Sequence, residues 1–210
     1  MKKYCIFDLD GTLIDSMSEW GANMKRILDD EGIAYPENIV NILTPLGNEG
    51  SAKLFLEMGV KGTKEELTRR MSEYAYEAYS KRIVTKKGVP EFLKKLKNDG
   101  HILAVLTASP HITCDACLKN NGVYDLFDKV FTVEDFGLVK SDPEIYKRTA
   151  RALGAEMSQI TFFDDNITAL STAKKAGLEI VGVYDESSDK DTEKIMEISD
   201  RYIRSFEQLL

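Results

Sequence analysis

The stretch YCIFDLDGTL, residues 4–13, decides the fold expected for this chain. Its apolar start is too short for a helix and too hydrophobic for a surface strand, which predicts a strand buried on both faces of a parallel sheet. Asp8 follows directly, and ligands of open α/β sheets bind outside the carboxyl ends of the strands. Asp8 and Asp10 can face one pocket, because side chains alternate along an extended segment. Gly11 then allows a sharp turn that brings backbone amides close to an anion.

The two carboxylates suit phosphoryl transfer, in which one attacks the phosphorus and the other handles the proton of the leaving oxygen. A divalent cation must then offset the gathered negative charge. An ordinary turn with a solvated Asx cap explains the tetrad at residues 8–11 equally well when it is taken alone. The buried strand before the tetrad favours the functional interpretation.

The composition is that of a globular protein, with 43% hydrophobic and 30% charged residues in a chain of 210. No stretch approaches the ~18 apolar residues of a membrane span, and the first strand begins too early for a signal peptide. We therefore expect a cytoplasmic protein without a membrane partner, and a monomer. The net charge is −7, from 28 basic and 35 acidic residues, and no basic cluster interleaves with aromatics. This pattern disfavours nucleic-acid binding.

Three cysteines are present, and Cys114 and Cys117 form a Cys-x-x-Cys. A redox pair is conceivable, but no second pair completes a four-ligand zinc site. Both residues fall in a predicted helix, where two small apolar side chains one turn apart are the favoured interpretation.

The segment after the first strand is predicted to be entirely helical. Ser16 and Glu19 form a capping-box pattern that places a helix start near Ser16, and Thr63 and Glu66 form a second. No convincing buried strand interrupts this region. We predict a helical cap domain at residues 15–85, seated over the carboxyl edge of the sheet.

Helices and strands alternate through the remainder of the chain. Ser109 is predicted as an N-cap with Pro110 at the first helical position, and Asp142 with Pro143 opens a further helix. Such alternation implies a parallel sheet wound by right-handed crossovers. The expected fold is α/β, a Rossmann-like core of residues 1–14 and 86–210 with helices on both faces of the sheet. Its later strands are predicted at 102–106, 129–132, 160–163, 179–183 and 202–203.

Three further positions carry candidate chemistry. Thr107 and Ala108 end a strand, where a hydroxyl and free amides at a helix N-terminus would bind phosphate oxygens. Lys140 precedes a helix and could neutralise both a nucleophile and a phosphate. Asp164 and Asp165 end a buried strand, and such carboxylates are costly unless a cation or donors compensate them. Capping of the next helix is the competing explanation, but it needs only one such residue, so the pair favours a metal, and hard oxygen ligands point to magnesium.

The Asp-x-Asp-Gly-Thr sequence at residues 8–12 resembles the signature of the haloacid dehalogenase-like superfamily. Thr107, Lys140 and the acidic pair at 164–165 follow in the order of that family. The segment after Lys140 is also similar, although Ser141 stands where proline is usual. A helical insert directly after the first strand resembles the subclass that contains phosphoglycolate phosphatases and β-phosphoglucomutases.

The resemblance implies a magnesium-dependent phosphatase that acts on a small phosphorylated metabolite. Asp8 would be the nucleophile that forms an aspartyl phosphate, and Asp10 the general acid and base. The phosphate would be held by Thr107, Ala108 and Lys140. Mg²⁺ would be bound by Asp8, the Asp10 carbonyl, Asp165 and Asp164, with Asp165 ranked above Asp164.

Three rival activities stay open. A mutase would return the phosphoryl group to a sugar and needs basic residues that face the site from the insert, where Lys25, Arg26 and Lys53 are the candidates. A dehalogenase acting on carbon has no use for the metal site or for an acid at Asp10. A silent binding module need not retain all of these groups. Trp20 lies on an apolar helix face that favours packing, but it can also line the pocket.

Overall fold

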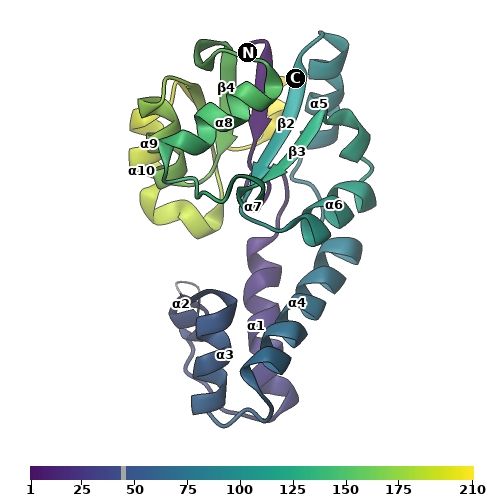
Figure 1. Cartoon of the computed structure of the whole chain (residues 1–210), viewed down its shortest axis with the longest axis vertical. Coiled ribbons are helices and arrows are strands. Elements are labelled where there is room, and N and C mark those ends of the chain that lie inside the picture. The colour runs from purple at the N-terminus through teal and green to yellow at the C-terminus, as the bar shows by residue number, and fades with distance from the viewer. Residues whose placement is uncertain (44–45) are drawn as a thin grey trace.

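The computed structural model describes residues 1–43 and 46–210, and it contains a six-stranded, fully parallel sheet with strand order β3-β2-β1-β4-β5-β6 (Figure 1). This confirms the predicted α/β fold. The strands are β1 (Tyr4–Phe7), β2 (Ile102–Thr107), β3 (Lys129–Thr132), β4 (Ile160–Asp164), β5 (Glu179–Val183) and β6 (Arg201–Ile203). The first strand lies in the middle of the sheet, so the polar residues that follow it meet those that follow β2 and β4.

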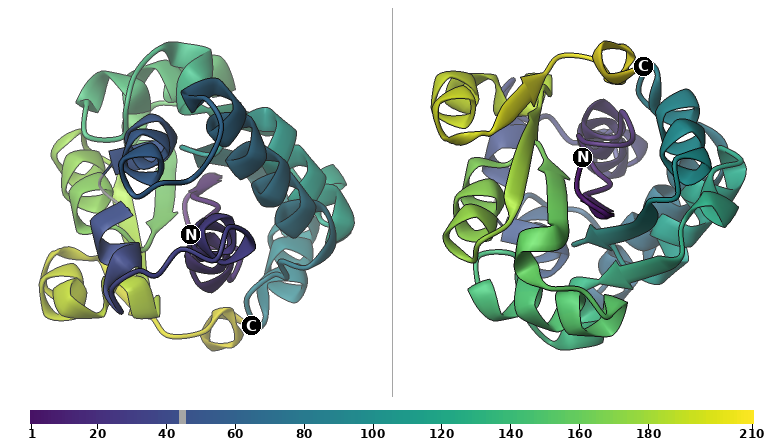
Figure 2. Two further views of the ribbon diagram at one scale, coloured as in Figure 1. Left: turned by 90° about the horizontal axis from the view of Figure 1, so that it is seen from below. Right: turned by 90° about the horizontal axis from the view of Figure 1, so that it is seen from above.

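Helices cover both faces of the sheet (Figure 2). Alternate residues of β1 face opposite sides: Cys5 and Phe7 join one apolar cluster, and Tyr4 and Ile6 join the other. The first cluster is closed by α5 (Val89–Asn98), α6 (His111–Asn120) and the short η5 (Phe206–Leu209). The second is closed by α8 (Pro143–Leu153), α9 (Ile167–Lys175) and α10 (Thr192–Ile198). Shorter turns are α7 (Val133–Phe136), η2 (Tyr124–Leu126), η3 (Met157–Gln159) and η4 (Glu186–Asp191).

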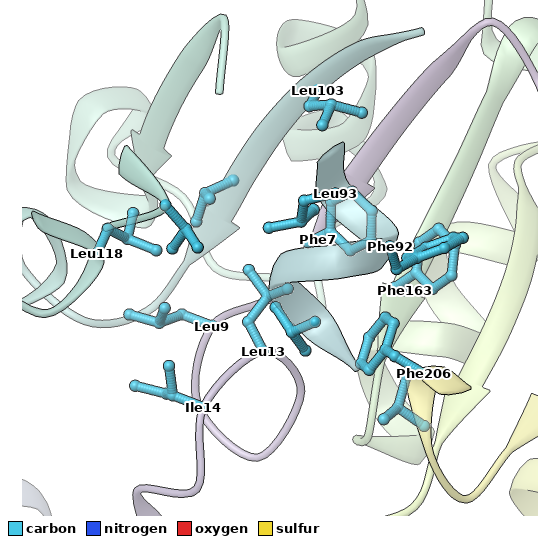
Figure 3. Packing of buried hydrophobic residues seen from close by; sticks show 14 of the residues in the cluster. Phe7, Leu9, Leu13, Ile14, Phe92, Leu93, Leu103, Leu118, Phe163 and Phe206 are labelled. Atoms are coloured by element: carbon cyan, nitrogen blue, oxygen red, sulfur yellow. The ribbon is translucent and has the colours of Figure 1, made fainter. Parts of the chain in front are cut away.

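A group of aromatic rings lies directly behind the end of β1 (Figure 3). The rings of Phe7 and Phe163 are stacked with centroids 4.4 Å apart, and Phe92 packs edge-on against Phe163 at 5.9 Å. Phe206 closes the group at 6.1 Å from Phe163. Such well-packed rings bury large apolar areas, and they give the residue after Phe7 a rigid base.

The segment between β1 and α5 folds into helices that lie beyond the carboxyl edge of the sheet (Figure 1). They are α1 (Met17–Asp30), α2 (Ile39–Leu43), α3 (Gly47–Glu57) and α4 (Lys64–Lys81), and they share an apolar cluster of their own. We call this segment the helical insert. It leaves and re-enters the core side by side, since the amide of Asp15 donates to the carbonyl of Val84 at 3.1 Å. Residues 44 and 45 of the predicted cap domain lie outside the described residues, and its limits at 15 and 85 stay a prediction.

The insert also rests on the core through α4, which packs against α6. Cys114 and Cys117 are both fully buried in α6, within the cluster that includes Ala78 and Tyr79 of α4. Both thiols are free, and burial raises the pKa of Cys117 to about 12. A thiol that stays protonated is a poor nucleophile, so these cysteines serve as small apolar side chains in the contact.

The capping predictions have a mixed outcome. Thr63 and Glu66 form the predicted capping box at the start of α4. Ser16 does precede α1, but its side chain makes no cap hydrogen bond. The prediction that Ser109 is an N-cap is also wrong, because α6 begins at His111 after Pro110 and Ser109 makes no cap contact. Both hydroxyls instead bind a carboxylate of the candidate site.

Candidate active site

The register of the sheet brings Asp8 and Asp164 side by side. Phe7 pairs with Phe163 in β4, so Asp8 and Asp164, the next residues of the two strands, emerge at the same edge. The amide of Asp8 donates to the carbonyl of Phe163 at 2.9 Å. Asp8 is 6% exposed and Asp164 is 1% exposed. The chain therefore places two carboxylates next to each other in a buried position at the end of the central strands.

Lys140 compensates both of these carboxylates. Its ammonium donates to Asp8 and, at 2.9 Å, to Oδ2 of Asp164. The Tyr146 hydroxyl donates to the Lys140 carbonyl at 2.9 Å, which fixes the loop that carries the lysine. Burial acts to lower the pKa of Lys140, but the attraction of Asp164 and Asp8 outweighs it and raises that pKa above its ordinary value. Lys140 is therefore charged at every physiological pH.

Asp165 completes a buried triad of carboxylates. Asp8, Asp164 and Asp165 each offer an oxygen within 4.8 Å of the others, a spacing that could hold a metal ion. Asp165 is oriented by Ser188, whose hydroxyl donates to Oδ2 at 2.7 Å, and by Thr12 at 3.3 Å from Oδ1. Three carboxylates against one ammonium leave an excess negative charge, and a divalent cation with oxygen ligands fits this donor set.

The competing explanation for the acidic pair, helix capping, is met by Asn166. Its side-chain oxygen accepts from the amides of Thr168 and Ala169 at 2.9 and 3.2 Å. Asp164 contributes only one oxygen to the local backbone, through the amide of Asn166 at 2.7 Å. Asp165 is thus not needed to begin α9, which leaves its carboxylate available to the triad.

The triad resists full ionisation on its own. Burial, opposed by Lys140 but reinforced by Asp164, raises the pKa of Asp8 well above its ordinary value. Burial and the neighbouring Asp164 raise the pKa of Asp165 to about 7. Such shifts report first the cost of burying a charge and then the repulsion between neighbouring carboxylates, and a bound cation would offset both.

Gly11 permits this arrangement by having no side chain. Its φ of +75° is one that other residues rarely adopt, and a Cβ at this position would lie 2.8 Å from Oδ2 of Asp165. The amide of Gly11 donates to the carbonyl of Ile14 at 3.1 Å and closes the predicted sharp turn. Glycine is therefore required here both by the backbone and by the carboxylate beside it.

Asp10 does not join the carboxylate triad but faces three hydroxyl groups. Ser16 donates to its Oδ1 at 2.7 Å, Ser109 donates to its Oδ2 at 2.6 Å, and the Tyr79 hydroxyl also donates to Oδ1. Burial and the charge of Asp10 raise the pKa of Tyr79 above its ordinary value, so its hydroxyl keeps the proton that it donates. Tyr79 belongs to α4, so a side chain of the insert directly contacts a candidate catalytic carboxylate.

These three partners of Asp10 were not recognised in the sequence. Ser16 and Ser109 carry local patterns that equally describe helix caps, and only their contacts separate the two roles. Tyr79 lies 69 residues from Asp10, and no spacing rule links them. Ser188, the partner of Asp165, comes from the polar segment after β5, which has no distinguishing motif.

Thr107 and Ala108 lie at the end of β2, where the sequence places them, and β2 pairs with β1. Thr107 is fully buried, and its Oγ1 accepts from the amide of Ser109 at 3.0 Å. Ala108 lines the same cavity as Asp8 and Lys140.

That cavity has a volume of about 1200 Å³ and extends from the carboxylates to the insert. Among the described residues, the insert side chains that line it are Met17, Trp20, Val40 and Asn41. The mutase candidates are not among them. Arg26 pairs with Glu77 at 3.1 Å and Lys53 pairs with Glu57 at 3.9 Å, both on the surface of the insert.

The family model of the haloacid dehalogenase-like hydrolases matches residues 5–183. The chain belongs to this family. The resemblance predicted from the Asp-x-Asp-Gly-Thr signature is thereby confirmed. No helix in the described parts of this hydrolase is long and apolar enough to cross a membrane.

Individual relatives cover most of the hydrolase. It is 29% identical over 183 residues to a validoxylamine A 7′-phosphate phosphatase of Streptomyces hygroscopicus subsp. limoneus, covering 87% of this chain and 86% of the relative. It is 28% identical over 194 residues to a phosphoglycolate phosphatase of Psychrobacter arcticus, covering 87% and 83%. The fold matches that of a provisionally assigned β-phosphoglucomutase of Thermotoga maritima with a TM-score of 0.84 at 23% identity, covering 99% of this chain and 96% of the other.

Proposed function

We propose that this hydrolase is a magnesium-dependent phosphatase that releases phosphate from a small phosphorylated metabolite through an aspartyl phosphate on Asp8. The observation that carries the proposal is the setting of Asp8, a buried carboxylate that contacts Lys140 and lies beside two further carboxylates. The similarity of most of the chain to relatives named as phosphatases supports the same reaction class.

The proposed reaction has two displacement steps. A carboxylate oxygen of Asp8 attacks the phosphorus, the bond from phosphorus to the ester oxygen breaks, and Asp10 gives its proton to the leaving alcohol. Water then attacks the aspartyl phosphate, Asp10 takes a proton from that water, and inorganic phosphate leaves with Asp8 restored. Ser16, Tyr79 and Ser109 would orient the Asp10 carboxylate for both proton transfers.

Positive charge and hydrogen-bond donors must stabilise the transferring phosphoryl group. Lys140 would supply one charge next to Asp8, and Thr107 with the amide of Ala108 would donate to phosphate oxygens. Mg²⁺, held by Asp8, Asp165, Asp164 and the Asp10 carbonyl, would when bound screen the nucleophile from the phosphate.

Hydrolysis is favoured over the rival activities by the lining of the cavity. A mutase needs a second anion site on the insert, yet the described insert residues that line the cavity carry no charge. A dehalogenase would not need the carboxylate triad or an acid at Asp10. We propose further that the insert acts as a cap domain, because it closes the cavity opposite Asp8 and its Tyr79 contacts Asp10.

A panel of phosphate monoesters assayed for released phosphate tests the proposal. Activity should require Mg²⁺, disappear in EDTA and return when Mg²⁺ is added in excess. Ca²⁺ should inhibit, because it accepts looser and higher coordination. Full activity in chelator would remove the metal from the proposal, and isomerisation of sugar phosphates faster than phosphate release would replace the phosphatase with a mutase.

A further inference from the structure

The part of the cavity that would hold the alcohol of the ester has an apolar wall. Met17 and Trp20 of α1 and Val40 of α2 line it from the insert, and Val133 and Val139 line it from the core. Trp20 is half-buried and packs on the apolar cluster of the insert. Val139 is 58% exposed, next to the catalytic Lys140. An exposed valine at the mouth of a site is apolar surface that a ligand can cover.

Polar side chains line the cavity mainly from the core. Away from the carboxylates and Lys140, they are Ser141, Asn166, Thr168 and, from η4, Ser187, Ser188, Lys190 and Asp191. Ser188 is already engaged with Asp165, and Asn41 is the polar side chain that the described insert adds. The insert side is therefore mostly apolar, and any hydroxyl of a polyol that faced Met17, Trp20 and Val40 would be left without a partner, which weakens binding.

The volume of the cavity also favours a bulky alcohol. About 1200 Å³ exceeds the ~300–1,000 Å³ typical of small-molecule sites, so a substrate the size of a two-carbon acid would leave most of the cavity filled with water. An alcohol that carries a ring would fill more of it. Aromatic rings prefer stacked or edge-on contacts with other rings, so Trp20 is a suitable partner.

We propose that the substrate is a phosphate monoester whose alcohol carries an aromatic ring, and that this ring packs against Trp20. The inference rests on the proposed phosphatase function and deepens it, since it assigns Trp20 as the residue that selects the leaving group. The geometry assigns the opposite, phosphate-binding end to Thr107, Ala108 and Lys140.

Turnover gives the first test. In the presence of Mg²⁺, kcat/KM should be at least about tenfold higher for benzyl phosphate, pyridoxal 5′-phosphate or a nucleoside 5′-monophosphate than for glycerol 3-phosphate, glucose 6-phosphate or phosphoglycolate. Trp20→Ala should lower kcat/KM for the preferred aromatic ester about tenfold, mainly through KM, and Trp20→Phe should keep most of it. Tyr76→Ala is the matched control, because Tyr76 is an exposed aromatic residue of the insert outside the cavity, and its rates should equal those of the wild type.

Binding gives a second test that does not depend on turnover. Trp20 is the single tryptophan of the chain, so intrinsic tryptophan fluorescence reports on this residue alone. In the Asp8→Asn variant, which should not consume the ester, aromatic phosphates should change the emission saturably and polyol phosphates should not.

The two tests separate the inference from the function on which it rests. The role of Trp20 would be overturned if phosphate is released without a preference for aromatic esters and if these esters leave the Trp20 emission unchanged. The phosphatase function would then still stand. A preference for phosphoglycolate that Lys190→Ala abolishes would also overturn it, in favour of a small anionic alcohol held by η4. If aromatic esters change the emission saturably but no phosphate is released from any ester or from acetyl phosphate, the aromatic site stands and the phosphatase function is overturned.

Discussion

The core and the helical insert place their charges in opposite ways. In the described part of the chain, the buried carboxylates are Asp8, Asp164, Asp165 and Asp185, and all four belong to the core. The insert instead carries its ion pairs on the surface, as between Arg69 and Glu73 at 2.7 Å. Buried charges are costly and demand partners, whereas surface pairs contribute little. The core therefore bears the energetic cost of the buried carboxylates at the candidate site, whereas the described insert residues that line the cavity are uncharged.

The largest effect should come from removing Asp8, the proposed nucleophile, in the core. Asp8→Asn should lower kcat by at least about 10³-fold, because an amide cannot form the aspartyl phosphate. The thermal transition should be retained, since the change also removes one of three repelling carboxylates. Phosphate release and thermal unfolding measured on the same preparation check both statements.

The matched control for Asp8 is Asp185, another buried carboxylate of the core. It accepts from Lys86 at 2.8 Å and lies outside the triad. Asp185→Asn should keep kcat within about twofold but lower the free energy of unfolding by about 1–3 kcal/mol, because Lys86 loses its charged partner. If Asp8→Asn kept the wild-type turnover, the assignment of a catalytic role to Asp8 and a structural role to Asp185 would be wrong.

A second test concerns how much the buried carboxylate triad lowers the free energy of unfolding when no metal is bound. The raised pKa of Asp165, about 7, means that between about pH 4 and 7 the folded protein holds a proton that the unfolded chain has released. The free energy of unfolding should therefore fall as pH rises through this window. Asp165→Asn should remove the effect, so in EDTA it should be more stable than the wild type at pH 8 by up to about 4 kcal/mol, from about 3 pKa units at about 1.4 kcal/mol each.

The measurement is chemical unfolding in EDTA at pH 5 and pH 8. The difference between the two proteins should grow with pH and reverse at pH 8 when Mg²⁺ is added, because only the wild type keeps the full ligand set. A difference that does not change with pH would show that the triad is not under electrostatic strain.

A third test addresses Tyr79, where the two regions meet. Tyr79→Phe should lower kcat for alkyl phosphates about tenfold, a fraction of the roughly 10²–10⁴ that general acid catalysis contributes, because Asp10 loses one of three orienting donors. The loss should be smaller for p-nitrophenyl phosphate, whose leaving group departs without a proton. Equal losses for both ester types would indicate a structural role instead.

Tyr74→Phe provides the control on the same helix. The Tyr74 hydroxyl donates to Asp30 at 2.6 Å at the surface of the insert, so its loss should leave the ratio between the two ester types unchanged.

The smallest effect should follow changes to the charged surface of the insert. Arg26→Ala removes the pair with Glu77 and the contact over the Tyr74 ring at 4.1 Å. It should leave the thermal transition almost unchanged, because exposed ion pairs contribute little, and change kcat/KM by less than twofold for every ester. A large and selective loss for one sugar phosphate would instead place Arg26 at the site and favour the mutase.

The sequence alone determined the sheet and the positions of its functional residues. Short apolar runs that end in polar residues specify buried parallel strands, and parallel strands bring their carboxyl ends to one edge. The position of Asp8 beside Asp164 follows from this pattern. The contact of Lys140 with both carboxylates does not, because Lys140 comes from the loop after α7. The helical nature of the insert follows similarly from its periodicity and from the capping box at Thr63.

The groups that surround Asp10 and those that line the cavity depend on how the insert packs on the core. Ser16 and Ser109 looked like helix caps because hydroxyl groups at those positions serve either purpose, and the nearby carboxylate determines which. Tyr79 reaches Asp10, and Trp20 reaches the cavity, through the packing of the insert on the core. Contacts between elements far apart in sequence depend on the relative placement of two packed bodies, and no local spacing encodes that placement.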